Sequence, residues 1–181
     1  MRKLITAVIF LMAFVAAAFC ADSDTMSLSN GYKEIKLGMS MDEVKKKLRY
    51  SAEFAPEHIE AVQTRMEPDV KTITAEGVNP QSGLIKLGYF FFDDDDNLAA
   101  ITIKINESKI SYYSILKRFT EKYGNPNEFE PDRAIWSDDQ TRIILEKPCE
   151  LKYQSADYNS GSKPNTDILY NKLRDKFIDD L

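Results

Sequence analysis

The chain has little of the chemistry on which enzymes and metal proteins usually rely. Its 181 residues include one histidine, two cysteines and seven glycines. One histidine excludes sites built from several histidines, and the few glycines form neither a phosphate loop nor a dinucleotide-binding fingerprint. No spacing of residues selects a nucleophile with its base or a set of metal ligands. The sequence therefore predicts a noncatalytic protein without a cofactor.

Positive charge is also scarce. The chain has 24 lysines and arginines against 29 aspartates and glutamates, a net charge of −5. Proteins gain affinity for nucleic acid from clustered lysine and arginine side chains that neutralise phosphates. A chain of this charge has no electrostatic reason to bind nucleic acid, so we expect none among its partners.

Residues 1–20 have the pattern of a secretory signal peptide. Arg2 and Lys3 precede an apolar run over residues 4–19, and small residues lie near its end. The run has 16 residues, fewer than the roughly 20 that a membrane-spanning helix needs. The sequence thus predicts export, to a periplasmic or outer-membrane-associated location in a bacterium.

Cys20 is a candidate lipidation site. Bacterial lipoproteins are cut just before a cysteine that is then acylated, but the preceding residue here is Phe19, where a small one is preferred. Cleavage by an ordinary signal peptidase after Ala18 or Cys20 satisfies the small-residue rule better. Lipidation of Cys20 and ordinary cleavage therefore both stay open. Membrane contact is expected only through this anchor. If Cys20 is removed or acylated, Cys149 has no disulfide partner, whereas a bridge between them needs cleavage upstream of Cys20.

The mature chain reads as one domain. Residues 21–31 are polar and serine-rich, which is typical of a flexible stalk, and residues 32–181 form the predicted domain. Ser40 and Glu43 make a capping box at the start of a helix with Val44 and Leu48 on one face. A second helix is predicted over residues 111–123, where Gly124 and then Pro126 end it.

Two further helices are expected. Pro56 is a suitable first residue for a short helix carrying Ile59, Val62 and Met66, which Pro68 ends. A terminal helix begins near Thr166, and its apolar stripe consists of Leu169, Leu173 and Phe177.

Strands are predicted where apolar residues alternate, at residues 70–75, 85–92, 98–105, 134–137, 142–146 and 151–154. Consecutive strands joined by tight turns indicate an antiparallel sheet with helices packed on one face, an α+β domain. The order of a helix followed by strands occurs twice, which hints at two tandem units.

Residues 85–92 are apolar on both faces, because Tyr89, Phe90, Phe91 and Phe92 follow one another. One face is expected to contact helices. The other is covered either by a partner or ligand, to which Tyr113 and Trp136 would also contribute, or by another helix, the terminal one included.

Other polar groups are better explained structurally. The acidic runs at residues 93–96 and 138–139 read as turns, since an EF-hand starting at Asp93 would need glycine at Leu98 and glutamate at Lys104. His58 is expected to be solvated on the helix after Pro56, and Cys149 to be a buried, inert thiol. Residues 106–108 match the N-glycosylation acceptor sequence, which matters only in a eukaryote.

The segment Leu-Gly-Met-Ser-Met-Asp-Glu-Val at residues 37–44 resembles the helix entry of small envelope proteins of the SmpA/OmlA (BamE-like) and β-lactamase-inhibitor-like type. There, a Gly-Met-Ser/Thr-x-x-Glu/Gln-Val segment opens a helix that packs on a small antiparallel sheet. The Gly-x-Pro that usually closes that helix is absent after Leu48 but present at residues 124–126. The resemblance implies a noncatalytic envelope protein that binds other proteins, and it transfers no functional residue.

Three functions remain open. The leading hypothesis is an exported cell-envelope protein, periplasmic or lipid-anchored, that binds an envelope protein partner. The alternative is a secreted inhibitor or adaptor of an extracytoplasmic enzyme. An exported hydrolase is disfavoured, because no nucleophile, base or metal-ligand set is apparent.

Overall fold

The computed structural model describes residues 27–63 and 71–159. The predicted signal peptide, the lipidation site at Cys20, residues 21–26 of the stalk and the terminal helix from Thr166 lie outside the described residues. Among the residues that the structure describes, no helix has the length and apolar character needed to cross a membrane.

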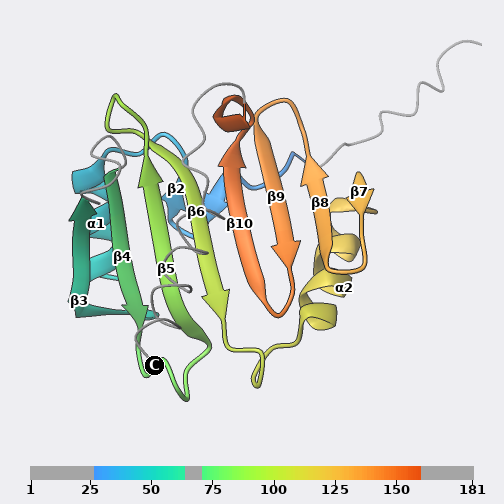
Figure 1. The fold of residues 1–181 in the computed structure, drawn as a ribbon, viewed down its shortest axis with the longest axis horizontal. Helices are drawn as coiled ribbons and strands as arrows, with labels where there is room; N and C mark the ends of the chain where they lie inside the picture. The colour runs from blue at the N-terminus through green and yellow to red at the C-terminus, as the bar shows by residue number, and fades with distance from the viewer. Residues whose placement is uncertain (1–26, 64–70, 160–181) are drawn as a thin grey trace, which may run out of the picture.

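A single antiparallel sheet dominates the described part of the chain (Figure 1). Its eight strands lie in the order β3-β4-β5-β6-β10-β9-β8-β7. Their bounds are Phe54–Gln63 (β3), Lys71–Gly77 (β4), Ile85–Phe92 (β5), Leu98–Ile105 (β6), Glu128–Phe129 (β7), Arg133–Ser137 (β8), Thr141–Glu146 (β9) and Glu150–Ser155 (β10). A small hairpin, β1 (Gly31–Tyr32) and β2 (Ile35–Lys36), precedes the sheet, and the 3-10 helix η2 (Ala156–Asn159) follows it.

Two α-helices lie within the described residues, as their capping signals predict: α1 (Met41–Arg49) and α2 (Tyr112–Tyr123). The backbone N–H of Ser40 donates to the Glu43 carboxylate at 2.9 Å, which satisfies a group that no helical carbonyl can reach. Ser111 caps α2, its hydroxyl accepting from the Ser114 N–H at 3.2 Å. Gly124, with φ of 82°, then ends α2 in a conformation that glycine adopts easily.

Both α-helices lie on one face of the sheet, behind it in Figure 1. Facing residues of neighbouring strands point to the same side, and one such row runs across the sheet through Ile73, Phe90, Ile101, Tyr153, Ile143 and Trp136. All six belong to the core, together with Val44 and Leu48 of α1. From α2, Phe119 packs edge-on against Trp136, with ring centroids 5.6 Å apart. The predicted α+β class with an antiparallel sheet is therefore confirmed, and strands predominate.

The helix predicted after Pro56 is wrong. The chain there forms β3, an edge strand that pairs with β4 along most of its length. The apolar spacing of Ile59 and Val62 fits a helix, but Phe54 and Ala55 are buried at the start of the strand. An edge strand tolerates proline, and the pairing register shifts between Phe54 and Ile59, around Pro56. Backbone pairing with β4 thus prevails over the local pattern.

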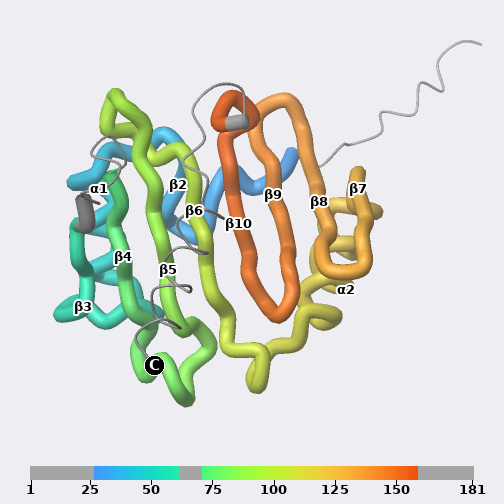
Figure 2. The backbone as a smooth tube through the Cα atoms, viewed as in Figure 1, coloured from blue at the N-terminus to red at the C-terminus, as the bar shows by residue number. Residues whose placement is uncertain are grey.

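The topology is symmetric about its central strand pair. The run α1-β3-β4-β5-β6 is followed by the run α2-β7-β8-β9-β10, and the last strands of the two runs, β6 and β10, pair with each other. Figure 2 shows the two runs side by side, blue to yellow-green in one half and yellow to orange in the other.

Candidate functional site

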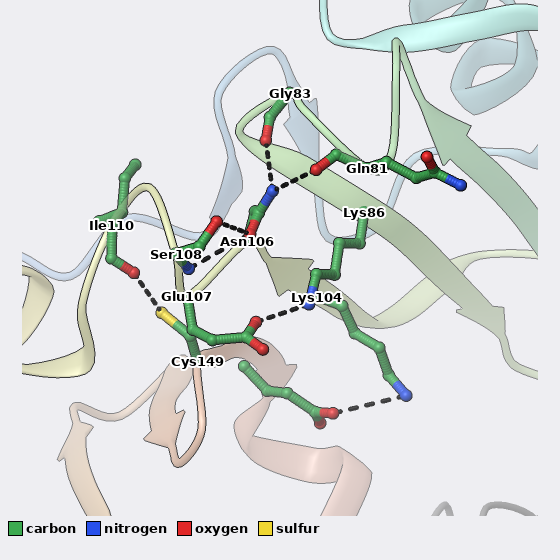
Figure 3. Close-up of polar contacts among 10 residues, drawn as sticks. Gln81, Gly83, Lys86, Lys104, Asn106, Glu107, Ser108, Ile110 and Cys149 are labelled. Atoms are coloured by element: carbon green, nitrogen blue, oxygen red, sulfur yellow. Dashed lines mark hydrogen bonds and ion pairs between the residues drawn. The ribbon is translucent and has the colours of Figure 1, made fainter.

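Several connections meet at one end of the sheet. Because neighbouring strands are antiparallel, the β4–β5 loop, the β6–α2 connection and the β9–β10 turn all lie where β4, β6 and β9 end. We call residues 78–84, 106–113 and 147–149 the loop end; Figure 3 shows its polar contacts. Connections carried on a rigid sheet are common positions for binding residues.

Asn106 joins two of these connections. Only 3% of it is exposed. Its Nδ2 donates to the backbone oxygens of Gln81 at 3.2 Å and Gly83 at 3.0 Å (Figure 3). Its Oδ1 accepts from the N–H and the hydroxyl of Ser108. Asn106 of the glycosylation acceptor sequence therefore acts as a structural tie between the β4–β5 loop and the β6–α2 connection. Its amide nitrogen is already used in hydrogen bonds to the loop.

Cys149 is buried next to this tie. Its Sγ donates to the backbone oxygen of Ile110 at 3.3 Å (Figure 3), and 1% of the residue is exposed. Burial, followed by the negative charge of Glu107, raises the pKa of the thiol, and Lys86 only partly opposes this. Because the nucleophilic form of cysteine is the thiolate, a thiol kept neutral in this way fits the expected inert cysteine.

Ion pairs surround the tie. Lys86 contacts Glu107 at 2.6 Å, and this hydrogen bond is the main reason why the pKa of Glu107 lies below its usual value. Lys104 contacts Glu150 at 3.5 Å between β6 and β10, and both side chains are about one-fifth exposed. The first pair joins β5 to the β6–α2 connection, and the second joins β6 to β10.

Apolar side chains project from the β4–β5 loop and from the first turn of α2. The exposed fractions are 43% for Val78, 53% for Leu84 and 65% for Tyr113. The Asn106 N–H donates to the Leu84 oxygen at 2.9 Å, which holds these segments against each other. Lys147 lies near Tyr113, with its Nζ 5.5 Å from the ring centroid. Exposed apolar and aromatic side chains on a held framework are typical of protein contact surfaces.

Sequence reasoning singled out Tyr113 but missed Val78 and Leu84. Val78 and Leu84 are the first and last residues of the β4–β5 loop, whose composition predicts only irregular structure. Their exposure depends on how β4 and β5 are paired, and no local pattern reports that. The role of Asn106 was equally hidden, because its partners Gln81 and Gly83 lie more than twenty residues away in the chain.

The other predicted positions lie apart from one another. His58 is on edge strand β3 rather than on a helix, and its Nδ1 is 3.9 Å from the Glu76 carboxylate. Its side chain is 57% exposed, so the expected solvation is correct although the expected element is not. Within residues 27–63 and 71–159, no three histidine, cysteine, aspartate or glutamate side chains are grouped to hold a metal ion.

The two acidic runs form turns. Asp93 Oδ1 accepts from the N–H groups of Asp95 and Asn97 in the β5–β6 turn. In the β8–β9 turn, burial would raise the pKa of Asp138, but hydrogen bonds from the N–H groups of Gln140, Thr141 and Leu28 outweigh it and lower the pKa. The bond from Leu28, at 3.0 Å, ties the chain before β1 to the sheet. The carboxylates of Asp93 and Asp138 therefore hold the backbone of these turns through hydrogen bonds.

Comparison with known proteins gives one match. The family model described as the TP0088 domain matches residues 30–163, which include every strand of the sheet and both α-helices. Neither the curated proteins nor the solved structures contain a match.

Proposed function

The chain belongs to the TP0088 domain family, and we propose that it is a noncatalytic, exported cell-envelope protein that binds a partner protein through its loop end. The observation that carries this proposal is the exposure of Val78 and Leu84 on the loop that Asn106 holds, and of Tyr113 in the first turn of α2. A surface whose backbone is already ordered loses less conformational entropy on binding than a mobile loop does.

The noncatalytic part of the proposal rests on the surroundings of the reactive residue types. Cys149 is buried and its thiol pKa is raised, while His58 is solvated on an edge strand. A cysteine nucleophile needs the opposite, an accessible thiol with a lowered pKa beside a base.

Export to the envelope is proposed from the sequence of residues 1–20. A lipid on Cys20 would anchor the domain through residues 21–26, and cleavage elsewhere would release it into the periplasm. The mass of the mature N-terminal peptide distinguishes these forms.

We also propose that the two helix-then-strands runs are tandem copies of one unit. Ser40 and Ser111 cap the two helices, and core-facing residues follow each cap by four and eight positions: Val44 and Leu48 in α1, Ile115 and Phe119 in α2. The pairing of β6 with β10 supports the same relation, because equivalent last strands meet at the centre.

The test of binding is affinity purification of the tagged full-length protein from its own crosslinked envelope. A variant carrying Leu84→Asp and Tyr113→Asp is compared with the wild type, and Asp94→Ala, in the exposed turn at the opposite end of β5, is the control. We expect a stoichiometric partner with the wild type and the control, and its loss with the double variant. An equal yield of partner from all three would exclude the loop end, and recovery of the protein alone would contradict the proposed function.

A further inference from the structure

A second apolar patch lies on the sheet face that points away from the helices. The strand registers place Thr72, Phe91 and Ala100 opposite one another on β4, β5 and β6, and they place Tyr89 opposite Thr102. The rings of Tyr89 and Phe91 are stacked, with centroids 6.3 Å apart. We call Thr72, Tyr89, Phe91, Ala100 and Thr102 the second-face patch.

The second-face patch is more buried than its position explains. Phe91 and Ala100 are each 3% exposed, Thr102 is 5% exposed and Thr72 is 7% exposed. Phe91 and Ala100, the two hydrophobic residues among these four, lie outside the core cluster formed with the helices. Figure 1 places α1 and α2 on the opposite side of the sheet. The β1–β2 hairpin is on that opposite side too, since Tyr32 packs against the core residue Phe54.

A phenyl ring on an uncovered sheet face would keep much of its surface in contact with water. Within residues 27–63 and 71–159, no helix or strand lies over the second-face patch. An apolar cover is therefore needed. The buried threonines Thr72 and Thr102 are consistent with one, because their methyl groups suit a pleated surface that another element contacts.

The chain after η2 supplies a segment with the required pattern. Leu169, Leu173 and Phe177 recur every four residues, which places them on one stripe if residues 166–181 are helical. Lys172 and Arg174 would flank this stripe, and Asp175 would lie on the opposite side of the helix. Such a helix would be about 24 Å long, close to the roughly 26 Å of an eight-residue strand such as β5.

The segment also begins within reach of the second-face patch. β10 ends at Ser155 and pairs with β6, which in turn pairs with β5. Two strand spacings amount to about 10 Å, whereas the chain over residues 160–165 can extend to roughly 20 Å. We propose that residues 166–181 form an amphipathic helix that docks, through Leu169, Leu173 and Phe177, on the second-face patch of the same molecule.

This docking makes the domain a three-layer structure, with helices on both faces of the sheet. It covers the second-face patch with a segment of the same molecule and leaves the apolar side chains of the loop end exposed. The inference does not depend on the proposed function, because it rests on the burial of the second-face patch and on the length and pattern of the terminal segment.

Photocrosslinking tests the contact directly. A benzophenone amino acid replaces Leu173 in the mature protein, and the same group at Asp175 is the control, because that position lies opposite the apolar stripe of the proposed helix. We expect monomeric crosslinked product from position 173 to map to peptides covering residues 71–77 or 85–105, in several-fold higher yield than from position 175. Crosslinked dimers would make a second copy the occupant, and equal yields from both positions would show no defined contact; either result overturns the proposal.

Thermal unfolding provides an independent measurement without a bulky probe. Leu173→Ala removes apolar contact with the second-face patch and should lower Tm, whereas Lys172→Ala should leave Tm unchanged. The dye ANS, which binds exposed apolar surface, should fluoresce more strongly with Leu173→Ala. If neither substitution changes Tm or ANS fluorescence, residues 166–181 do not cover the sheet and the proposal fails.

Discussion

At the scale of the residue, Asn106 shows how one buried amide organises a surface. Both its polar atoms are used, Nδ2 by the oxygens of Gln81 and Gly83 and Oδ1 by Ser108. A buried polar group is stabilising only while its partners are present, since an unpaired one has lost water without replacement. The loop end therefore depends on this residue type, and not merely on a polar residue at this position.

The first prediction concerns Asn106→Asp. This substitution keeps the shape of the side chain but replaces Nδ2, which donates to the Gln81 and Gly83 oxygens, with an oxygen that cannot donate when the carboxyl group is ionised. We expect the free energy of unfolding, measured with urea, to fall by about 2–3 kcal/mol, the cost of leaving buried polar groups unpaired. Ser108→Ala removes only the hydroxyl that donates to Oδ1, keeps the backbone N–H that also donates to it, and should cost less. A loss for Asn106→Asp no larger than that for Ser108→Ala would contradict the proposed tie.

At the scale of the element, helices and strands differ in how far their determinants extend. α1 and α2 begin at serine caps and place apolar residues four positions apart, and both signals act within one or two turns. β3 has no comparable local signal. Its N–H and carbonyl groups pair with β4, after a connection of seven residues, 64–70. An edge strand with one proline and few alternating residues is consequently mistaken for a helix.

The second prediction concerns the contact between β3 and β5. A Cβ added at Gly88 would lie 2.9 Å from Cε1 of Phe54 and 3.0 Å from Cε2 of Phe90, and both rings are fully buried. We expect Gly88→Ala to lower the free energy of unfolding by about 1–3 kcal/mol through overpacking. Phe54→Leu should recover part of that loss in the same background, so the two substitutions should be non-additive in a urea double-mutant cycle. Simple additivity would show that the Phe54 ring does not restrict position 88.

At the scale of the whole molecule, the core is continuous across the two helix-then-strands runs. Tyr153 of the second run faces Ile101 of the first, and the β1–β2 hairpin adds Tyr32 to the same core. Burial is the main cause that raises the pKa of both tyrosines, and the neighbouring carboxylate of Glu53 raises that of Tyr32 further. These hydroxyls stay protonated where those of the unfolded chain would ionise.

The third prediction is a loss of stability at high pH. Above about pH 10 the tyrosines of the unfolded chain release protons, while Tyr32 and Tyr153 keep theirs in the fold because their pKa values are raised. The folded state then binds more protons than the unfolded state, so stability falls as pH rises, by at most about 1.4 kcal/mol per pH unit for each tyrosine. Urea unfolding between pH 8 and pH 11 measures the slope, and Tyr153→Phe should make it shallower. An unchanged slope would mean that Tyr153 ionises as readily in the fold as in the unfolded chain.

The sequence by itself determined the elements whose signals are local: the α+β class, both capped helices, the β5–β6 hairpin and the strands β4, β8, β9 and β10. Capping and alternation act between residues a few positions apart, so they can be read without the fold. Only the tertiary structure decided the order of the strands, the identity of β3, and the meeting of Asn106 with the β4–β5 loop. Those features depend on hydrogen bonds and packing between residues that are distant in the chain. Such contacts form only after the chain has closed long loops, so no local pattern in the sequence reports them.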